Sequence, residues 1–136
     1  KLADEGLQFI YHNHAFEFQK FDGITCLEVL IEETNPDAFH FELDTYWIQA
    51  GGGNPVTWIE KVAGRMKVVH FKDMGNAGDN LPIMTEVGEG NLEWPKIIAA
   101  CQRIGVEYAA VEQDICQRDP FESLAISYRN LKLLGL

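Results

Sequence analysis

The sequence lacks a long apolar run, a closely spaced pair of cysteines and an excess of basic residues. No apolar stretch approaches the roughly 20 residues that a membrane-spanning helix needs, so we expect no membrane partner. The cysteines are Cys26, Cys101 and Cys116, and none belongs to a CxxC motif. The sequence therefore indicates neither a disulfide framework nor a structural zinc site, and unpaired thiols favour a reducing, cytoplasmic location.

The charge balance is strongly acidic. Eleven Lys and Arg stand against 21 Asp and Glu in 136 residues, which gives a net charge of −10. A protein that binds a phosphate backbone needs clustered cations, so we expect no nucleic-acid partner. The composition, 46% hydrophobic and 24% charged, is that of a globular domain with enough apolar material for a core.

Short apolar runs alternate with longer amphipathic ones, which predicts an α/β fold of consecutive βα units. The predicted strands cover residues 7–14, 38–44, 66–73 and 108–114. The predicted helices cover residues 24–33, 55–63, 92–104 and 120–134, the last three capped by Asn54, Asn91 and Asp119. The loop from residue 74 to 90 is longer than an ordinary connection, which is typical of functional loops.

Strands separated by helices pair in parallel, either in an open sheet or as part of a barrel. A closed (β/α)₈ barrel takes about 250 residues, and this chain has little more than half of that. A dinucleotide-binding fold needs a Gly-rich turn after the first strand, and residues 15–18 read Ala-Phe-Glu-Phe instead. The first residue is Lys1 rather than Met, so we expect an N-terminally truncated chain.

Each predicted strand ends in at least one imidazole or carboxylate, at the edge where α/β folds place their active sites. These polar residues are His12 and His14, Asp44, His70 and Lys72, and Glu112 and Asp114. Side chains alternate along a strand, so Glu42 shares a face with Asp44. Mixed imidazole and carboxylate ligands suit Mn²⁺, Co²⁺, Fe²⁺ or Zn²⁺, which would act as a Lewis acid.

Structural interpretations compete with this hypothesis at several positions. Asp44 can simply cap the segment that follows it, and His40, low in its strand, is typical of a hydrogen-bonded structural histidine. The run Gly51–Gly53 has no Lys-Ser or Lys-Thr after it, so a turn is favoured over a phosphate-binding loop. Trp47 follows a strand end, where an indole ring can stack on a ligand.

Five motifs resemble those of the sugar phosphate isomerase/epimerase family, a branch of the xylose isomerase-like TIM barrel superfamily. In order they are YHNHAFEF (11–18), LDTYW (43–47), VHFKD (69–73), GEGNLEW (88–94) and VEQD (111–114). The resemblance covers essentially the whole chain. It implies a single domain over residues 1–136 that corresponds to the second half, strands five to eight, of a (β/α)₈ barrel.

The resemblance also implies a divalent metal, Mn²⁺ first, with Co²⁺, Zn²⁺ or Fe²⁺ as alternatives. Carried over by motif, the ligands are Asp44, His70, Glu112 and, where relatives have a Glu, His12 or His14. Glu112 doubles as the catalytic base, and Glu17 is a further catalytic candidate that reaches in where the first glutamate is missing. Lys72, Asp114 and Trp47 are implied to contact the substrate, with Lys72 also in a catalytic role.

The function implied is that of a metal-dependent sugar isomerase or epimerase acting on a keto-sugar through a metal-stabilised enediolate. Dehydration of a keto-sugar and cleavage of a 3-keto-glycoside are alternatives within the superfamily. A different alternative is an inactive half-barrel, or a binding module that forms homo-oligomers through its exposed edges. The endonuclease IV-like branch is disfavoured, because the chain has only four His and a charge of −10.

Overall fold

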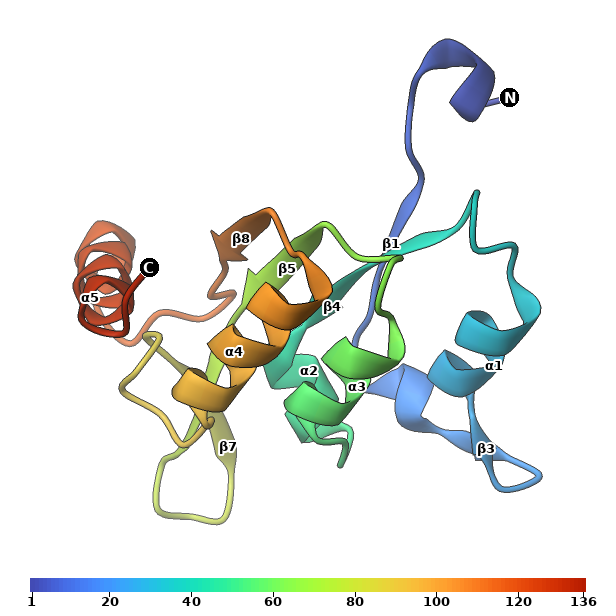
Figure 1. Cartoon of the computed structure of the whole chain (residues 1–136). Coiled ribbons are helices and arrows are strands. Elements are labelled where there is room, and N and C mark those ends of the chain that lie inside the picture. Colours follow the sequence, from blue (N-terminus) through green and yellow to red (C-terminus); the bar gives the residue numbers. More distant parts are fainter.

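A parallel four-stranded sheet forms the centre of the chain (Figure 1). This computed structural model describes residues 1–136 except for the side chain of residue 3. The sheet has the order β1-β4-β5-β8. Its strands are β1 (Ile10–His12), β4 (His40–Asp44), β5 (Val68–Phe71) and β8 (Tyr108–Val111). All three strand pairs are parallel, so the four carboxyl ends lie at the same edge.

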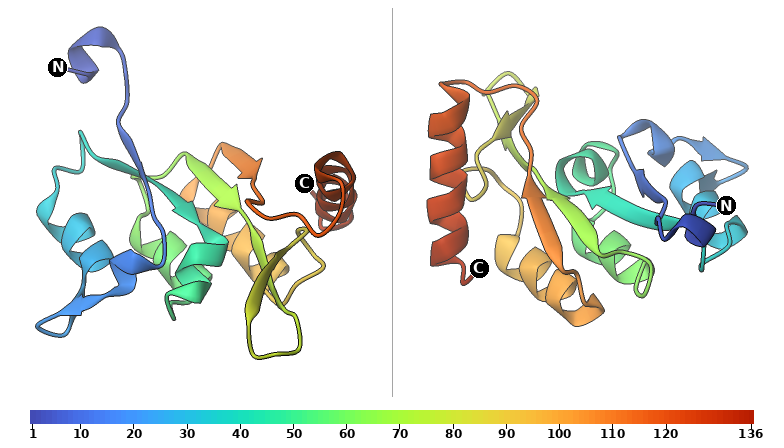
Figure 2. Two further views of the ribbon diagram at one scale, coloured as in Figure 1. Left: turned by 180° about the vertical axis from the view of Figure 1, so that it is seen from behind. Right: turned by 90° about the horizontal axis from the view of Figure 1, so that it is seen from above.

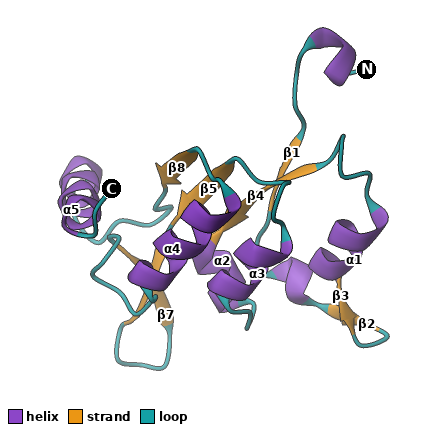
Figure 3. Cartoon of the chain, in the orientation of Figure 1, coloured by secondary structure: helices purple, strands orange, loops and turns teal.

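Helices and two antiparallel hairpins connect these strands (Figure 3). The helices are α1 (Cys26–Glu33), α2 (Thr45–Ala50), α3 (Pro55–Lys61), α4 (Trp94–Ile104) and α5 (Pro120–Leu133), with short 3₁₀ turns η1 (Ala3–Glu5) and η2 (Phe16–Phe18). The hairpins pair β2 (Lys20–Phe21) with β3 (Ile24–Thr25), and β6 (Asp73–Asn76) with β7 (Pro82–Thr85). No helix in the described part of the chain has the length and apolar character to cross a membrane.

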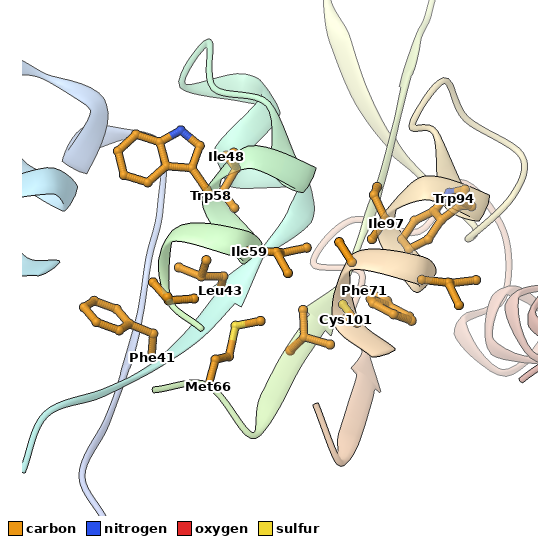
Figure 4. Close-up of a cluster of buried hydrophobic side chains, with 14 of the residues drawn as sticks. Phe41, Leu43, Ile48, Trp58, Ile59, Met66, Phe71, Trp94, Ile97 and Cys101 are labelled. Atoms are coloured by element: carbon orange, nitrogen blue, oxygen red, sulfur yellow. The ribbon is translucent and has the colours of Figure 1, made fainter. Parts of the chain in front are cut away.

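The hydrophobic core lies between one face of the sheet and helices α3 and α4 (Figure 4). Phe41 and Leu43 of β4 and Phe71 of β5 are at most 1% exposed and pack against Ile59 of α3 and Ile97 of α4. Alternation along each strand directs the intervening residues to the opposite face. The packing of the core therefore fixes which polar side chains lie together on the other face.

Helix α5 lies beyond the β8 edge of the sheet (Figure 2). Polar contacts attach it to the segment that follows β7. Ser123 donates a hydrogen bond to Glu86, Ser127 accepts one from the Val87 amide, and Asn130 donates one to the Val87 carbonyl.

The predicted α/β fold is confirmed, and the boundaries need several corrections. The strands are shorter than predicted, and the helix expected over 24–33 begins at Cys26, with Thr25 as its cap. Caps Asn54 and Asp119 are confirmed. The Asn91 cap was wrong, because α4 begins at Trp94 after Glu93 without a side-chain cap. Helix α2 and the β6–β7 hairpin occupy segments expected to be loops.

Candidate metal centre

One side chain from the end of each parallel strand meets at a single point on the sheet's polar face. His12, Asp44, His70 and Glu112 each offer a ligand atom, and these four atoms all lie within 4.8 Å of one another. The register explains the meeting, because Asp44 lies directly opposite His70 and the Glu112 amide bonds to the carbonyl of the last β5 residue. We refer to these four residues as the ligand cluster.

The contacts inside the ligand cluster are those of hydrogen-bonded imidazoles and carboxylates. His70 Nδ1 lies 2.5 Å from Glu112 Oε2, and His12 Nε2 lies 3.4 Å from Asp44 Oδ2 and 4.0 Å from Glu112 Oε2. The hydrogen bond to Asp44 raises the pKa of His12, against the opposing effect of burial. Glu112 keeps 36% of its side chain exposed, so a ligand can reach it from solvent.

The two carboxylate oxygens of Asp44 have different surroundings. Oδ1 accepts a hydrogen bond from the Trp47 amide and caps α2. Oδ2 faces the ligand cluster, 3.4 Å from His12 Nε2 and 3.9 Å from His70 Nδ1. Because the cap fixes the carboxylate plane, Asp44 presents its second oxygen in a defined orientation.

Lys72 places an ammonium group beside the ligand cluster. Its side chain is 1% exposed, and Nζ lies 3.2 Å from Asp44 Oδ2, 3.1 Å from Glu112 Oε2 and 2.8 Å from Asp114 Oδ2. Burial lowers the pKa of Lys72, but the hydrogen bonds to Asp114, Glu112 and Asp44 outweigh it and leave the pKa raised. The same hydrogen bond, from Lys72, lowers the pKa of Asp114. The ammonium also lies 5.4 Å from the Trp47 ring centroid.

Two buried polar residues that the sequence analysis did not select align the strand ends. The side-chain oxygen Oδ1 of Asn13 accepts a hydrogen bond from the Asp44 backbone amide at 2.9 Å. The Thr45 hydroxyl contacts the carbonyls of His70 and Lys72 and accepts from the Lys72 amide. Asn13 lies between His12 and His14, and Thr45 directly follows Asp44. This adjacency to predicted ligands is the sequence signal that could have identified both residues.

The remaining predicted site residues lie outside the ligand cluster. His14 is exposed, 5.0 Å from the His12 ring and 5.3 Å from the Trp47 ring between centroids, so these rings line one side of the site. Glu17 is 2% exposed, and its two oxygens accept hydrogen bonds from the Tyr11 hydroxyl and the His14 amide. Burial and the Glu17 hydrogen bond raise the pKa of Tyr11 to about 12. In this arrangement Glu17 holds the loop after β1.

His40 also lies outside the ligand cluster, at the opposite end of β4 from Asp44. The hydrogen-bonded role expected for it is not seen at Nδ1, which is buried without a partner among the described residues.

The donor chemistry of the ligand cluster fits a first-row divalent ion. Two imidazoles and two carboxylates suit Mn²⁺, Fe²⁺, Co²⁺ or Zn²⁺ better than Ca²⁺, which prefers oxygen ligands alone. With Asp44 and Glu112 turned toward a cation, Asp114 remains as a carboxylate partner for Lys72. The site can therefore hold a divalent ion without leaving the lysine unpaired.

Comparison with known proteins gives matches that run over nearly the whole chain. No family model matches. The chain is 27% identical to an inosose dehydratase of Lacticaseibacillus casei over 90% of its own length and 46% of the relative's. A sugar phosphate isomerase/epimerase structure from Parabacteroides distasonis superposes with a TM-score of 0.79 and 29% identity, over 96% of this chain and 46% of that one. A xylose isomerase domain protein from Planctomyces limnophilus superposes with a TM-score of 0.71 at 20% identity, over 97% of this chain and 46% of that one.

The chain is similar in sequence and fold to proteins of the xylose isomerase-like TIM barrel superfamily. It spans about half the length of the curated relatives it matches. Its four parallel strands correspond to half of the superfamily's barrel. The proteins that it matches above 25% identity carry the names inosose dehydratase and sugar phosphate isomerase/epimerase.

Proposed function

We propose that this chain carries the divalent-metal site of an enzyme that removes a proton next to the carbonyl group of a keto-sugar or sugar derivative. The observation that supports it most is the ligand cluster, with four ligand atoms from four adjacent strands within 4.8 Å. Lys72 adds a buried cation in contact with two of the four residues. This combination of ligands and a fixed ammonium group is suited to stabilising negative charge on a substrate oxygen.

In this proposal Asp44, His70, Glu112 and His12 hold the metal, which would polarise the substrate carbonyl as a Lewis acid. Glu112, which is partly exposed, accepts the proton from the adjacent carbon. Lys72 donates a hydrogen bond to the oxygen on which negative charge develops, while Asp114 holds its ammonium group in place. His14 and Trp47 form an aromatic side wall for the sugar.

Loss of water from the substrate is a second candidate, and one residue favours it. His12 occupies the position at which the resemblance to ketose 3-epimerases implies a glutamate. Epimerisation uses two carboxylates, one on each side of the reacting carbon, and here only Glu112 remains of that pair. Dehydration needs one base for the proton and one acid for the leaving hydroxyl group, roles open to Glu112 and Lys72. The similarity to inosose dehydratases supports the same alternative.

Proton exchange in D₂O tests the reaction class. The chain is supplied with Mn²⁺ and offered ketoses, inososes and 3-keto-glycosides, and the products are followed by NMR. Deuterium at the carbon next to the carbonyl, with the substrate skeleton retained, indicates isomerisation or epimerisation, and an unsaturated product indicates dehydration. Glu112→Gln should abolish either signal, and Glu122→Gln, an exposed glutamate on α5, is the matched control. Exchange at the wild-type rate in Glu112→Gln would contradict the proposal.

A further inference from the structure

His70 lies between carboxylates on both edges of its imidazole ring. Nδ1 faces the ligand cluster, 2.5 Å from Glu112 Oε2 and 3.9 Å from Asp44 Oδ2. Nε2 lies 3.3 Å from Oε1 of Glu42, which is not a member of the ligand cluster. The two ring nitrogens therefore have separate partners, one set inside the cluster and one outside it.

Glu42 occupies this place because of the strand register. It pairs with His12 on β1 and with Val68 on β5. Glu42 lies two residues before Asp44 in β4, so the two side chains point to the same face of the sheet. Its side chain is only 17% exposed. Among the described residues, His70 is the one basic side chain within ion-pair distance of it. A carboxylate this far from water is costly unless it is paired or hydrogen-bonded, and His70 Nε2, 3.3 Å away, is the nearest partner for it.

We propose that Glu42 is a positioning residue for the metal centre, an inference that rests on the proposed metal site. It accepts a hydrogen bond from the Nε2–H group of His70 and thereby keeps the Nδ1 lone pair directed at the ligand cluster. A histidine that ligates a metal commonly donates its other ring N–H to a carboxylate, which fixes the tautomer and ring orientation and raises ligand basicity. The proposal assigns that partner in this chain and specifies Nδ1 as the ligand atom.

Zinc titration of three Glu42 and His70 variants provides the affinity test. Glu42→Ala should weaken Zn²⁺ binding by about 10- to 100-fold, the usual cost of losing an outer carboxylate partner. Glu42→Gln should lose less, because its amide oxygen still accepts the hydrogen bond. Glu28→Gln, whose side chain is 30% exposed and pairs with Lys61, is the matched control and should bind as wild type. His70→Ala should lose the site.

Long-range ¹H–¹⁵N spectra of the Zn²⁺-loaded protein provide the second readout, because they identify which ring nitrogen carries the proton. The expected result is a metal-bound Nδ1 and a protonated Nε2 in the wild type and in Glu42→Gln. Melting of the metal-free variants checks folding, and the isosteric Glu42→Gln keeps the test decisive where Glu42→Ala does not fold. Wild-type affinity in both Glu42 variants, or Nε2 ligation in the wild type, would overturn the inference. Equal binding by the wild type and His70→Ala would instead refute the proposed metal site itself, and with it this role of Glu42.

Discussion

Asp44 and Asp73 are both fully buried aspartates, yet their surroundings differ completely. Asp44 is the last residue of β4, and Asp73 follows the neighbouring strand β5 by two residues and begins β6. Asp73 accepts hydrogen bonds from the backbone amides of Met74, Gly88, Gly90 and Leu92 and from the Trp94 indole at 2.6 Å. All of these donors are uncharged and belong to the segment from residue 74 to 94. Both carboxylate oxygens of Asp73 accept hydrogen bonds from this segment and so hold it together.

Asp44 keeps one oxygen for groups that come from other strands. Its Oδ1 caps α2, and its Oδ2 faces His12, His70 and Lys72. These partners can change charge or be replaced by a metal ion, whereas backbone amides cannot. The comparison teaches that burial alone does not distinguish a structural carboxylate from a binding one. The identity of the donors does.

The largest effect on stability should come from Asp73→Asn. The substitution replaces an acceptor oxygen by an NH₂ group that faces N–H donors, so several buried donors lose their partner. We expect a loss of about 3–5 kcal/mol in the free energy of unfolding, measured by urea denaturation. Asp37→Asn, at an exposed aspartate, is the control and should stay close to wild type. A similarly small loss in Asp73→Asn would show that its carboxylate does not organise the 74–94 segment.

Lys72→Met should be the next most destabilising change in the metal-free protein. It leaves Asp44, Glu112 and Asp114 without their shared cation, and removing one partner from a buried ion pair costs about 3 kcal/mol or more. Lys61→Met breaks only the more exposed pair with Glu28 and should cost at most about 1 kcal/mol. Urea denaturation of both variants makes the comparison. Equal losses would mean that Lys72 is not an electrostatic partner of these carboxylates.

Trp94→Phe should have an intermediate effect. The change keeps an aromatic ring packed against Phe71 but removes the indole N–H that donates to Asp73. A hydrogen bond to a charged group contributes about 1.5–3 kcal/mol, and we expect a loss in that range by thermal or urea unfolding. Trp58→Phe changes another buried tryptophan, which is 8% exposed and lies outside the Asp73 contacts. It should cost less, and the reverse order would contradict the role assigned to the indole.

The smallest expected effect concerns acid stability. The hydrogen bond from Lys72 lowers the pKa of Asp114 in the folded state. In acid the unfolded state therefore binds more protons, so this stabilisation is complete above the ordinary aspartate pKa and is lost as the pH falls. The stability difference between wild type and Lys72→Met should narrow from about pH 5 downward, measured by urea denaturation across that range. A difference that widens in acid would contradict the pairing.

Most of the fold could be predicted from sequence because hydrophobic periodicity and helix caps are local signals. The four strands and the caps Asn54 and Asp119 came from such patterns. Helix α2 was missed because it has only six residues and follows the strand directly, with Asp44 as its cap. The β6–β7 hairpin was missed because its segment, rich in Gly and Asn, has no clear alternation of apolar residues.

The ligand cluster was partly predictable for a topological reason. Parallel strands bring their carboxyl ends to one edge, so Asp44, His70 and Glu112 were expected together before any distance was known. The sequence could not separate His12 from His14, because both fall on one face of the strand predicted over residues 7–14, whereas β1 ends at His12. It could not assign Glu17 either, since the hydrogen bonds with Tyr11 and His14 depend on how the loop after β1 folds back. The Glu42 contact likewise depends on exact strand register.

The central claim is that Asp44 belongs to a metal site and Asp73 to the fold. Calorimetric titration with Mn²⁺ tests it most directly. Wild type, Asp44→Asn and Asp73→Asn are compared at a temperature where all three are folded. We predict that Asp44→Asn loses Mn²⁺ binding, although the oxygen of the Asn amide can still cap α2. Asp73→Asn should bind Mn²⁺ with wild-type affinity despite its lower stability. Wild-type affinity in Asp44→Asn, or loss of binding only in Asp73→Asn, would contradict the assignment of one carboxylate to the metal and the other to the fold.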